Sequence, residues 1–136
     1  MNQTLQDLKT RRSCRRYRPE QILEAGVFAP TGMGMQSPKI VVVQDKETIE
    51  ELSKMNAKIM GVTSDPFYGA PTVLIVLADK NRNTYLEDGS LVMGNLMNAA
   101  HAVGVASCWI HRAKEEFESE EGKALLKKWG IEGDYA

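Results

Sequence analysis

Residues 88–103 read DGSLVMGNLMNAAHAV, the longest stretch of the chain with the pattern of a helix. Its apolar side chains continue most of the way around the predicted helix, whereas a surface helix needs only one apolar stripe. They are Leu91, Val92, Met93, Leu96, Met97, Ala99, Ala100 and Val103. The pattern therefore predicts a helix buried centrally or at an interface, and Gly94, Ala99 and Ala100 are small enough to let a second helix approach closely. In so short a domain, such a helix favours an obligate dimer.

Strands and further helices are predicted on both sides of this helix. The apolar runs 40–43 and 72–78 predict buried strands, and the second is apolar on both faces, as in a central strand. A third strand is predicted over 105–110. Further helices are predicted over residues 5–12, 21–28 and 46–60, and around Ala124–Trp129, with Ser119 as its N-cap and Gly130 at its C-cap. The alternation of helices and strands indicates a mixed class with three or four strands.

Length and composition restrict the class of protein. With 136 residues, the chain has room for a single domain, 1–136. Apolar residues at 43% and charged residues at 26% exclude a disordered or fibrous chain. No apolar run reaches the roughly 18 residues of a membrane helix, and the first residues lack a secretory pattern. We therefore expect a cytoplasmic protein that does not bind membranes.

The cysteine and histidine content argues against a disulfide framework and against a metal site. The two cysteines, Cys14 and Cys108, form no CxxC motif, and there are only two histidines. This composition fits a reducing compartment. We expect Cys108 to be a small buried apolar residue and not a nucleophile.

The net charge of −1 conceals two local runs of opposite sign. Six cations and no acid lie between Lys9 and Arg18, and five acids and no cation lie between Glu115 and Glu121. Guanidinium groups match phosphate oxygens and a serine hydroxyl adds a donor, so the basic run suits one phosphate dianion. The residues spaced for this are Arg11, Arg12, Ser13 and Arg15.

An exposed basic turn is the open alternative. Nucleic-acid binding is disfavoured because only Tyr17 offers an aromatic platform. A solvated surface also explains the acidic run.

Two other segments have the composition of ligand-binding segments. Residues 30–38 (PTGMGMQSP) contain two glycines, which let a backbone approach a flat ligand, and two methionines suited to contact an aromatic ring system. A plain connector is the alternative. Residues 104–112 (GVASCWIHR) bring Trp109, Ile110 and His111 to the end of the predicted third strand, where ligands of α/β sheets commonly lie. No side chain is nominated as a catalytic acid, base or nucleophile.

These segments, in this order, resemble the FMN-dependent nitroreductase family. Arg11-Arg12-Ser13-x-Arg15 resembles its N-terminal phosphate signature, and Ala29-Pro30-Thr31-Gly32-x-x-x-Gln36-Ser37-Pro38 resembles its flavin-ring loop. The stretch from Leu91 to Trp109 is similar to its interface helix and following strand. Residues 65–71 (DPFYGAP) fit the small bacterial members.

The resemblance implies an α+β sandwich, in which helices flank a central mixed or antiparallel sheet and a long buried helix forms the interface. It implies a homodimer with two FMN sites at that interface. By the resemblance, Arg11, Arg12, Ser13 and Arg15 would hold the phosphate and ribityl end. Pro30, Thr31, Gly32 and Gln36 of the other subunit would lie on the flavin face or edge. Trp109, Ile110 and His111 would line the redox edge, with a backbone N–H near His111 facing flavin N5.

The resemblance also implies the reaction. NAD(P)H would reduce FMN, and a nitroaromatic, quinone or similar acceptor would reoxidise it, so catalysis would belong to the cofactor. The chain departs from the family pattern near Gln21, where it has fewer residues, and at Ala136, where the family adds a strand and a basic arm. We therefore expect a shortened member. The alternative function is flavin binding by a remnant of the fold without NAD(P)H turnover.

Overall fold

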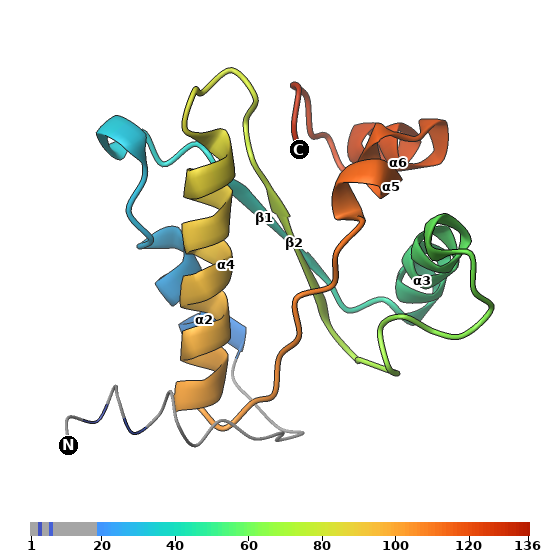
Figure 1. The fold of residues 1–136 in the computed structure, drawn as a ribbon, viewed down its shortest axis with the longest axis horizontal. Helices are drawn as coiled ribbons and strands as arrows, with labels where there is room; N and C mark the ends of the chain where they lie inside the picture. Colours follow the sequence, from blue (N-terminus) through green and yellow to red (C-terminus); the bar gives the residue numbers. More distant parts are fainter. Residues whose placement is uncertain (1–2, 4–5, 7–18) are drawn as a thin grey trace. The chain divides into compact units, whose positions relative to one another are not determined.

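The structure is a computed structural model that describes residues 3, 6 and 19–136. The elements follow one another along the chain as shown in Figure 1: α2 (Pro19–Val27), the 3-10 turn η1 (Gly32–Gly34), β1 (Lys39–Val43), α3 (Lys46–Met60), β2 (Val73–Leu77), α4 (Tyr85–Ala102), α5 (Ala113–Glu118) and α6 (Glu120–Lys128). Among the described residues, no helix is long and apolar enough to cross a membrane.

The chain divides into two compact units. The first contains the described residues up to Pro38 together with Thr84–Trp109, and the second contains Lys39–Asn83 together with Ile110–Ala136. Each unit therefore combines two segments that are distant in the sequence.

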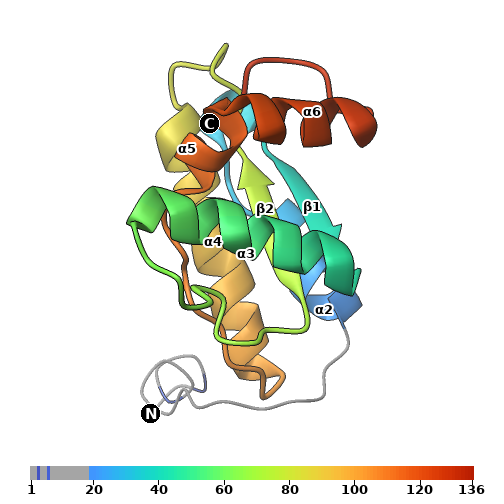
Figure 2. The ribbon, with the colours of Figure 1, turned by 90° about the vertical axis from the view of Figure 1, so that its right-hand side faces the viewer.

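The second unit is built on an antiparallel pair of strands. β1 and β2 pair in the register Lys39↔Leu77 to Val43↔Val73. Both are rich in β-branched residues, which favour the pleated backbone. Helices α3, α5 and α6 cover this pair and enclose a common core with it (Figure 2). The buried residues of that core are Val43, Leu52, Phe67, Ile75, Leu77, Phe117 and Leu125. The positions of the predicted strands 40–43 and 72–78 and of the predicted helix 46–60 are thus confirmed. β1 is only partly buried, since Val42 is 39% exposed, and among the described residues β2 pairs with β1 alone instead of taking the predicted central place.

The third strand predicted over 105–110 was wrong. Residues 105–108 alternate between half-buried and exposed positions, but the segment joins no strand of the described chain. An apolar, β-branched sequence makes a segment suitable for a sheet, yet a strand also needs a neighbour for its N–H and C=O groups. The described sheet consists of β1 and β2, with one isolated bridge between Asp79 and Tyr135.

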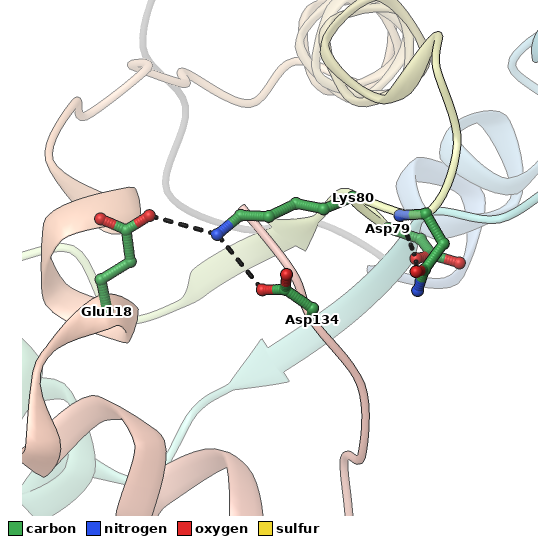
Figure 3. A network of polar contacts seen from close by, with 5 residues as sticks. Asp79, Lys80, Glu118 and Asp134 are labelled. Atoms are coloured by element: carbon green, nitrogen blue, oxygen red, sulfur yellow. Dashed lines mark hydrogen bonds and ion pairs between the residues drawn. The ribbon is translucent and has the colours of Figure 1, made fainter.

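The residues around that bridge attach the last part of the chain to the end of β2. The N–H of Ala78 donates to the carbonyl of Ala136 at 2.8 Å, and the N–H of Ala136 donates back at 2.9 Å. Figure 3 shows Lys80 reaching between Glu118 of α5 and Asp134, with its Nζ 3.2 Å from a carboxylate oxygen of each. Hydrogen bonds to Asp134 and Glu118 raise the pKa of Lys80. Lys80 therefore joins α5 to the segment around Asp134.

The first unit consists mainly of α2 packed against α4. The two helices share buried apolar residues, among them Ile22 and Leu96, and Asn95 Nδ2 of α4 donates to the carbonyl of Ala25 at 2.9 Å. α2 runs unbroken across Gln21 and Ile22.

α4 begins three residues before the predicted start, and its buried residues form one stripe on one side. On the rest of its surface, Leu86 and Leu91 are 60% and 46% exposed, and a Cβ built on Gly94 would have nothing within 4 Å.

The corner between α5 and α6 provides the first test of this fold. Ser119 ends α5 and caps α6, because its Oγ accepts from the N–H of Gly122 at 3.0 Å, as predicted for an N-cap. A Cβ on Gly122 would lie 2.0 Å from the carbonyl oxygen of Glu116 and 2.7 Å from the Cα of Phe117. Both are backbone atoms, so no side-chain rotation can relieve the clash. We expect Gly122→Ala to lower the free energy of unfolding by about 1–3 kcal/mol.

The control is Glu121→Ala at the neighbouring position of α6, whose side chain is 62% exposed and forms an ion pair with the exposed Lys58. That change should alter the free energy of unfolding by less than about 1 kcal/mol, because exposed ion pairs contribute little. Urea unfolding of both variants checks the pair. Equal stability of Gly122→Ala and the unmodified protein would contradict the close packing of Gly122 against the backbone of α5.

Candidate functional site

The structure describes seven of the eleven residues predicted to bind a cofactor. Arg11, Arg12, Ser13 and Arg15 lie outside the described residues. Pro30, Thr31, Gly32, Gln36 and Trp109 belong to the first unit, and Ile110 and His111 begin the last segment of the second unit. The structure therefore brings the loop residues together, and it places Trp109–His111 as one continuous stretch. The assembly of all these residues into one site stays a prediction.

The loop between α2 and β1 is held in shape by the side chain of Gln36. Gln36 Nε2 donates to the carbonyl oxygens of Val27 and Ala29 at 2.8 and 3.2 Å. Its Oε1 accepts from the hydroxyl of Thr31, and its backbone N–H donates to that same hydroxyl at 2.9 Å. Both polar atoms of the Gln36 side chain are thus used inside the loop. Gln36 shapes the surface that the loop presents.

Left-handed backbone conformations turn this loop outward. Met33, Gly34 and Gln36 have φ values of 55°, 64° and 48°. Such values are uncommon for residues with a Cβ, and they persist only where the surroundings fix them. Met33 is consequently 90% exposed at the outside of the turn. The loop therefore presents an apolar side chain and peptide groups, as its composition predicted.

A buried carboxylate ties this loop to the first turn of α4. Asp88 accepts from the N–H of Gly32 at 2.8 Å through Oδ1 and from the Thr84 hydroxyl at 3.0 Å through Oδ2. Figure 1 shows η1 beside this end of α4. A Cβ on Gly32 would lie 2.2 Å from Thr84 Oγ1. Glycine is therefore required at position 32 by an approach to Thr84, in addition to any approach of a ligand. The role of Asp88 was not predicted from the sequence, where its signal is an acid at a buried position of an apolar helix.

The stretch that leads into the second unit is open to solvent. Trp109 is 43% exposed and His111 is exposed. Cys108, expected to be buried, is exposed as well, so that prediction was wrong. The physical reason is the missing strand: a segment that pairs with no strand among the described residues leaves alternate side chains facing water.

A buried asparagine fixes the end of this stretch, and the sequence analysis did not assign it a role. Asn56 of α3, only 1% exposed, donates from Nδ2 to the carbonyl of His111 at 3.0 Å and to Glu116 Oε2 at 2.9 Å. Its Oδ1 accepts from Arg112 Nε at 2.9 Å. Arg112 has a φ of 81°, in the left-handed region. The available signal was a polar residue four positions after Leu52 on the apolar face of the predicted helix.

Glu116 completes this cluster and has unusual electrostatics. It was counted in the acidic run for which a solvated surface was one explanation, but it is 3% exposed and faces Asn56. Burial raises its pKa to about 7, against the opposing effects of the Asn56 hydrogen bond and the Arg112 charge, and the neighbouring Glu115 raises it further. Oε1 has no hydrogen-bond partner among the described residues. The carboxyl group therefore exchanges its proton near neutral pH.

Within the part of the chain that the structure describes, no group of three or more His, Cys, Asp or Glu side chains is arranged to hold a metal ion.

Comparison with known protein sequences gives a consistent result. The model of the nitroreductase family matches residues 8–135. A protein of Archaeoglobus fulgidus, provisionally named an NADH dehydrogenase/NAD(P)H nitroreductase, is 29% identical over 144 residues, covering 96% of this chain and 78% of its own length. A protein of Methanothermobacter thermautotrophicus with the same provisional name is 27% identical over 117 residues, covering 77% of this chain. The matched region is 59% of that second protein.

Comparison with solved structures extends this result to the fold. A nitroreductase of Bacteroides fragilis, crystallised with bound FMN, superposes with a TM-score of 0.85 at 27% sequence identity. The superposition covers 99% of this chain and 83% of that one. The described residues therefore share their α+β arrangement with a flavin-binding protein along almost the whole chain.

Proposed function

This chain belongs to the nitroreductase family, and on that premise we propose that it is an FMN-dependent oxidoreductase, which passes hydride from NAD(P)H through FMN to a nitroaromatic, quinone or similar acceptor. The observation that carries the proposal is the match over 99% of the chain to the FMN-bound nitroreductase of Bacteroides fragilis. When bound, FMN would supply the two-electron chemistry. The side chains of this protein would then bind and orient the cofactor and would not have to carry electrons themselves.

The chemistry of the available donors fits this cofactor. Arg11, Arg12, Ser13 and Arg15 would hold its phosphate and ribityl end, because guanidinium groups make charge-assisted hydrogen bonds to phosphate oxygens. The exposed side chains of Met33 and Trp109 are apolar surfaces that a flavin ring would cover. The backbone N–H groups near His111 would face flavin N5, where a fixed donor stabilises added negative charge without itself titrating.

The loop residues would act from a second copy of the chain. In the proposed homodimer, Pro30, Thr31 and Gly32 of one copy lie on the flavin of the other, and Gln36 acts by holding the loop in shape. The exposed Leu86 and Leu91 on α4, and the open space at Gly94, support a helix face available to a second copy. We further propose that residues 1–136 form a single domain, and the cysteine content supports a cytoplasmic location.

The absorbance spectrum of the purified protein tests the proposal. We expect yellow protein with a flavin band that bleaches when NADPH or NADH is added under exclusion of oxygen and returns with a quinone. Protein that stays colourless after incubation with FMN and removal of the excess would overturn the proposal. A stable yellow colour that neither NADPH nor NADH bleaches would instead identify flavin binding without turnover.

A further inference from the structure

We propose that Asn56 is a positioning residue for the redox edge: it fixes the peptide group between His111 and Arg112, so that the N–H groups of this segment are held in one orientation toward the flavin. The inference rests on the proposed function. Asn56 itself is expected to touch neither cofactor nor substrate, because it is buried in α3 behind the segment that it binds.

The direction of a peptide N–H follows from the position of its carbonyl oxygen. Asn56 Nδ2 donates to the carbonyl oxygen of His111 at 3.0 Å. A trans peptide is planar, so its N–H points opposite to its C=O. The hydrogen bond from Asn56 therefore fixes the direction of the Arg112 N–H, which points away from Asn56. The Asn56 side chain on one side of the peptide thus determines where the Arg112 N–H points on the other side.

Arg112, the next residue, has a strained backbone conformation. Arg112 has a φ of 81°, which is unfavourable for a residue with a Cβ. Its guanidinium Nε donates to Asn56 Oδ1 at 2.9 Å, so the same amide holds both sides of the strained position. Without this amide, the backbone at 111–112 would lose both contacts and would be free to relax.

The neighbours of Asn56 keep its side-chain amide from turning over. Glu116 Oε2 accepts from Asn56 Nδ2 at 2.9 Å, while Arg112 offers only donors to Oδ1. A flipped amide would direct its oxygen at the Glu116 carboxyl group and its N–H₂ at the Arg112 guanidinium group. Arg112, which can only donate, therefore selects the orientation in which Nδ2 reaches His111, and Glu116 favours the same orientation when it is ionised.

Two variants separate this role from simple packing. Asn56→Asp has almost the same shape and keeps an acceptor for Arg112, but, measured at a pH at which both carboxyl groups are ionised, it has no donor for His111 or Glu116. Asn56→Leu removes both kinds of contact. Asn95→Leu is the matched control, because Asn95 Nδ2 also donates to a backbone carbonyl, that of Ala25, at 2.9 Å. The midpoint potential of bound FMN, measured at saturating FMN against reference dyes, is the main readout.

We expect the preference for binding reduced over oxidised FMN to fall about tenfold in both Asn56 variants. This corresponds to a midpoint potential about 30 mV more negative for a two-electron couple. The Arg112 amide of the flavin-free protein should exchange its hydrogen faster in Asn56→Asp than in the unmodified protein. Asn95→Leu should lower thermal stability and leave the potential and the Arg112 exchange unchanged. If Asn56→Leu does not fold, Asn56→Asp decides the outcome.

The two possible failures are distinguishable. If the unmodified protein binds no FMN, the proposed function is overturned and this inference falls with it. If the unmodified protein binds FMN and Asn56→Asp leaves both the potential and the Arg112 exchange unchanged, only the positioning role is overturned. A potential that shifts equally in Asn95→Leu would also overturn it, because the effect would then follow from lost stability.

Discussion

Replacing Arg11 and Arg12 together by alanine should weaken FMN binding by about two to four orders of magnitude. Each charge-assisted contact to a phosphate contributes about 1.5–3 kcal/mol, and every 1.4 kcal/mol or so changes a dissociation constant about tenfold. The loss should be strongest at low salt, because screening weakens the same contacts in the unmodified protein. Titration of FMN fluorescence with the apoprotein measures the effect.

The control for this experiment removes two positive charges elsewhere. Lys46 and Lys123 have side chains that are 90% and 60% exposed, and each makes one ion pair within its own helix. Such exposed pairs contribute little to stability. The double variant Lys46→Ala/Lys123→Ala should therefore bind FMN like the unmodified protein. Equal losses in the two double variants would show that overall charge, and not the basic run, holds the phosphate.

Glu116→Gln should change how stability depends on pH. Glu116 has a pKa of about 7 in the folded protein against 4.5 for an ordinary glutamate. Between these two values the folded state holds a proton that the unfolded state has released. The free energy of unfolding should therefore fall by about 3 kcal/mol as the pH rises from 4.5 through 7, since one pKa unit corresponds to about 1.4 kcal/mol.

Glutamine keeps an acceptor for Asn56 and has no charge to bury, so Glu116→Gln should lack this fall. The variant should be the more stable protein at pH 8, and the difference should shrink towards pH 5. Urea unfolding at several pH values measures it. Glu115→Gln is the control, because Glu115 is the exposed neighbour, and it should change stability by less than about 0.5 kcal/mol. If the free energies of unfolding of Glu116→Gln and the unmodified protein differed by the same amount at every pH, the raised pKa of Glu116 would be contradicted.

Local sequence patterns were sufficient for much of the fold. α3 begins and ends where its apolar repeat predicted, because the repeat fixes the buried face and Asp45 caps the first turn through Thr48. The family and the α+β class, predicted from short motifs, are confirmed by the family match and the superposition. The strand over 105–110 was mispredicted because strand formation depends on a neighbour, which no local pattern contains.

The candidate site shows a similar limit. The glycines and methionines of the loop could be recognised from composition, but the requirement for Gly32 comes from Thr84, and the loop is anchored by Asp88, 56 positions later. Asn56 and Glu116 are 60 positions apart, and their pairing depends on the packing of α3 against α5. Contacts of this kind follow from the tertiary structure. The roles of Arg11, Arg12, Ser13 and Arg15 stay predictions.

The division of the chain into two interleaved units has a consequence for synthesis on the ribosome. α2 contacts α4, which begins at Tyr85. The apolar surface around Ile22 therefore stays exposed until about 60 further residues have been synthesised. Likewise, β1 and β2 emerge long before α5 and α6, whose Phe117 and Leu125 complete their core. The first unit needs the residues up to Trp109 and the second needs the residues of α6, so neither can complete its core when its own first segment emerges, and contacts so distant in sequence slow folding. The nascent chain should therefore carry exposed apolar surface until α6 has been synthesised, and such surface favours aggregation.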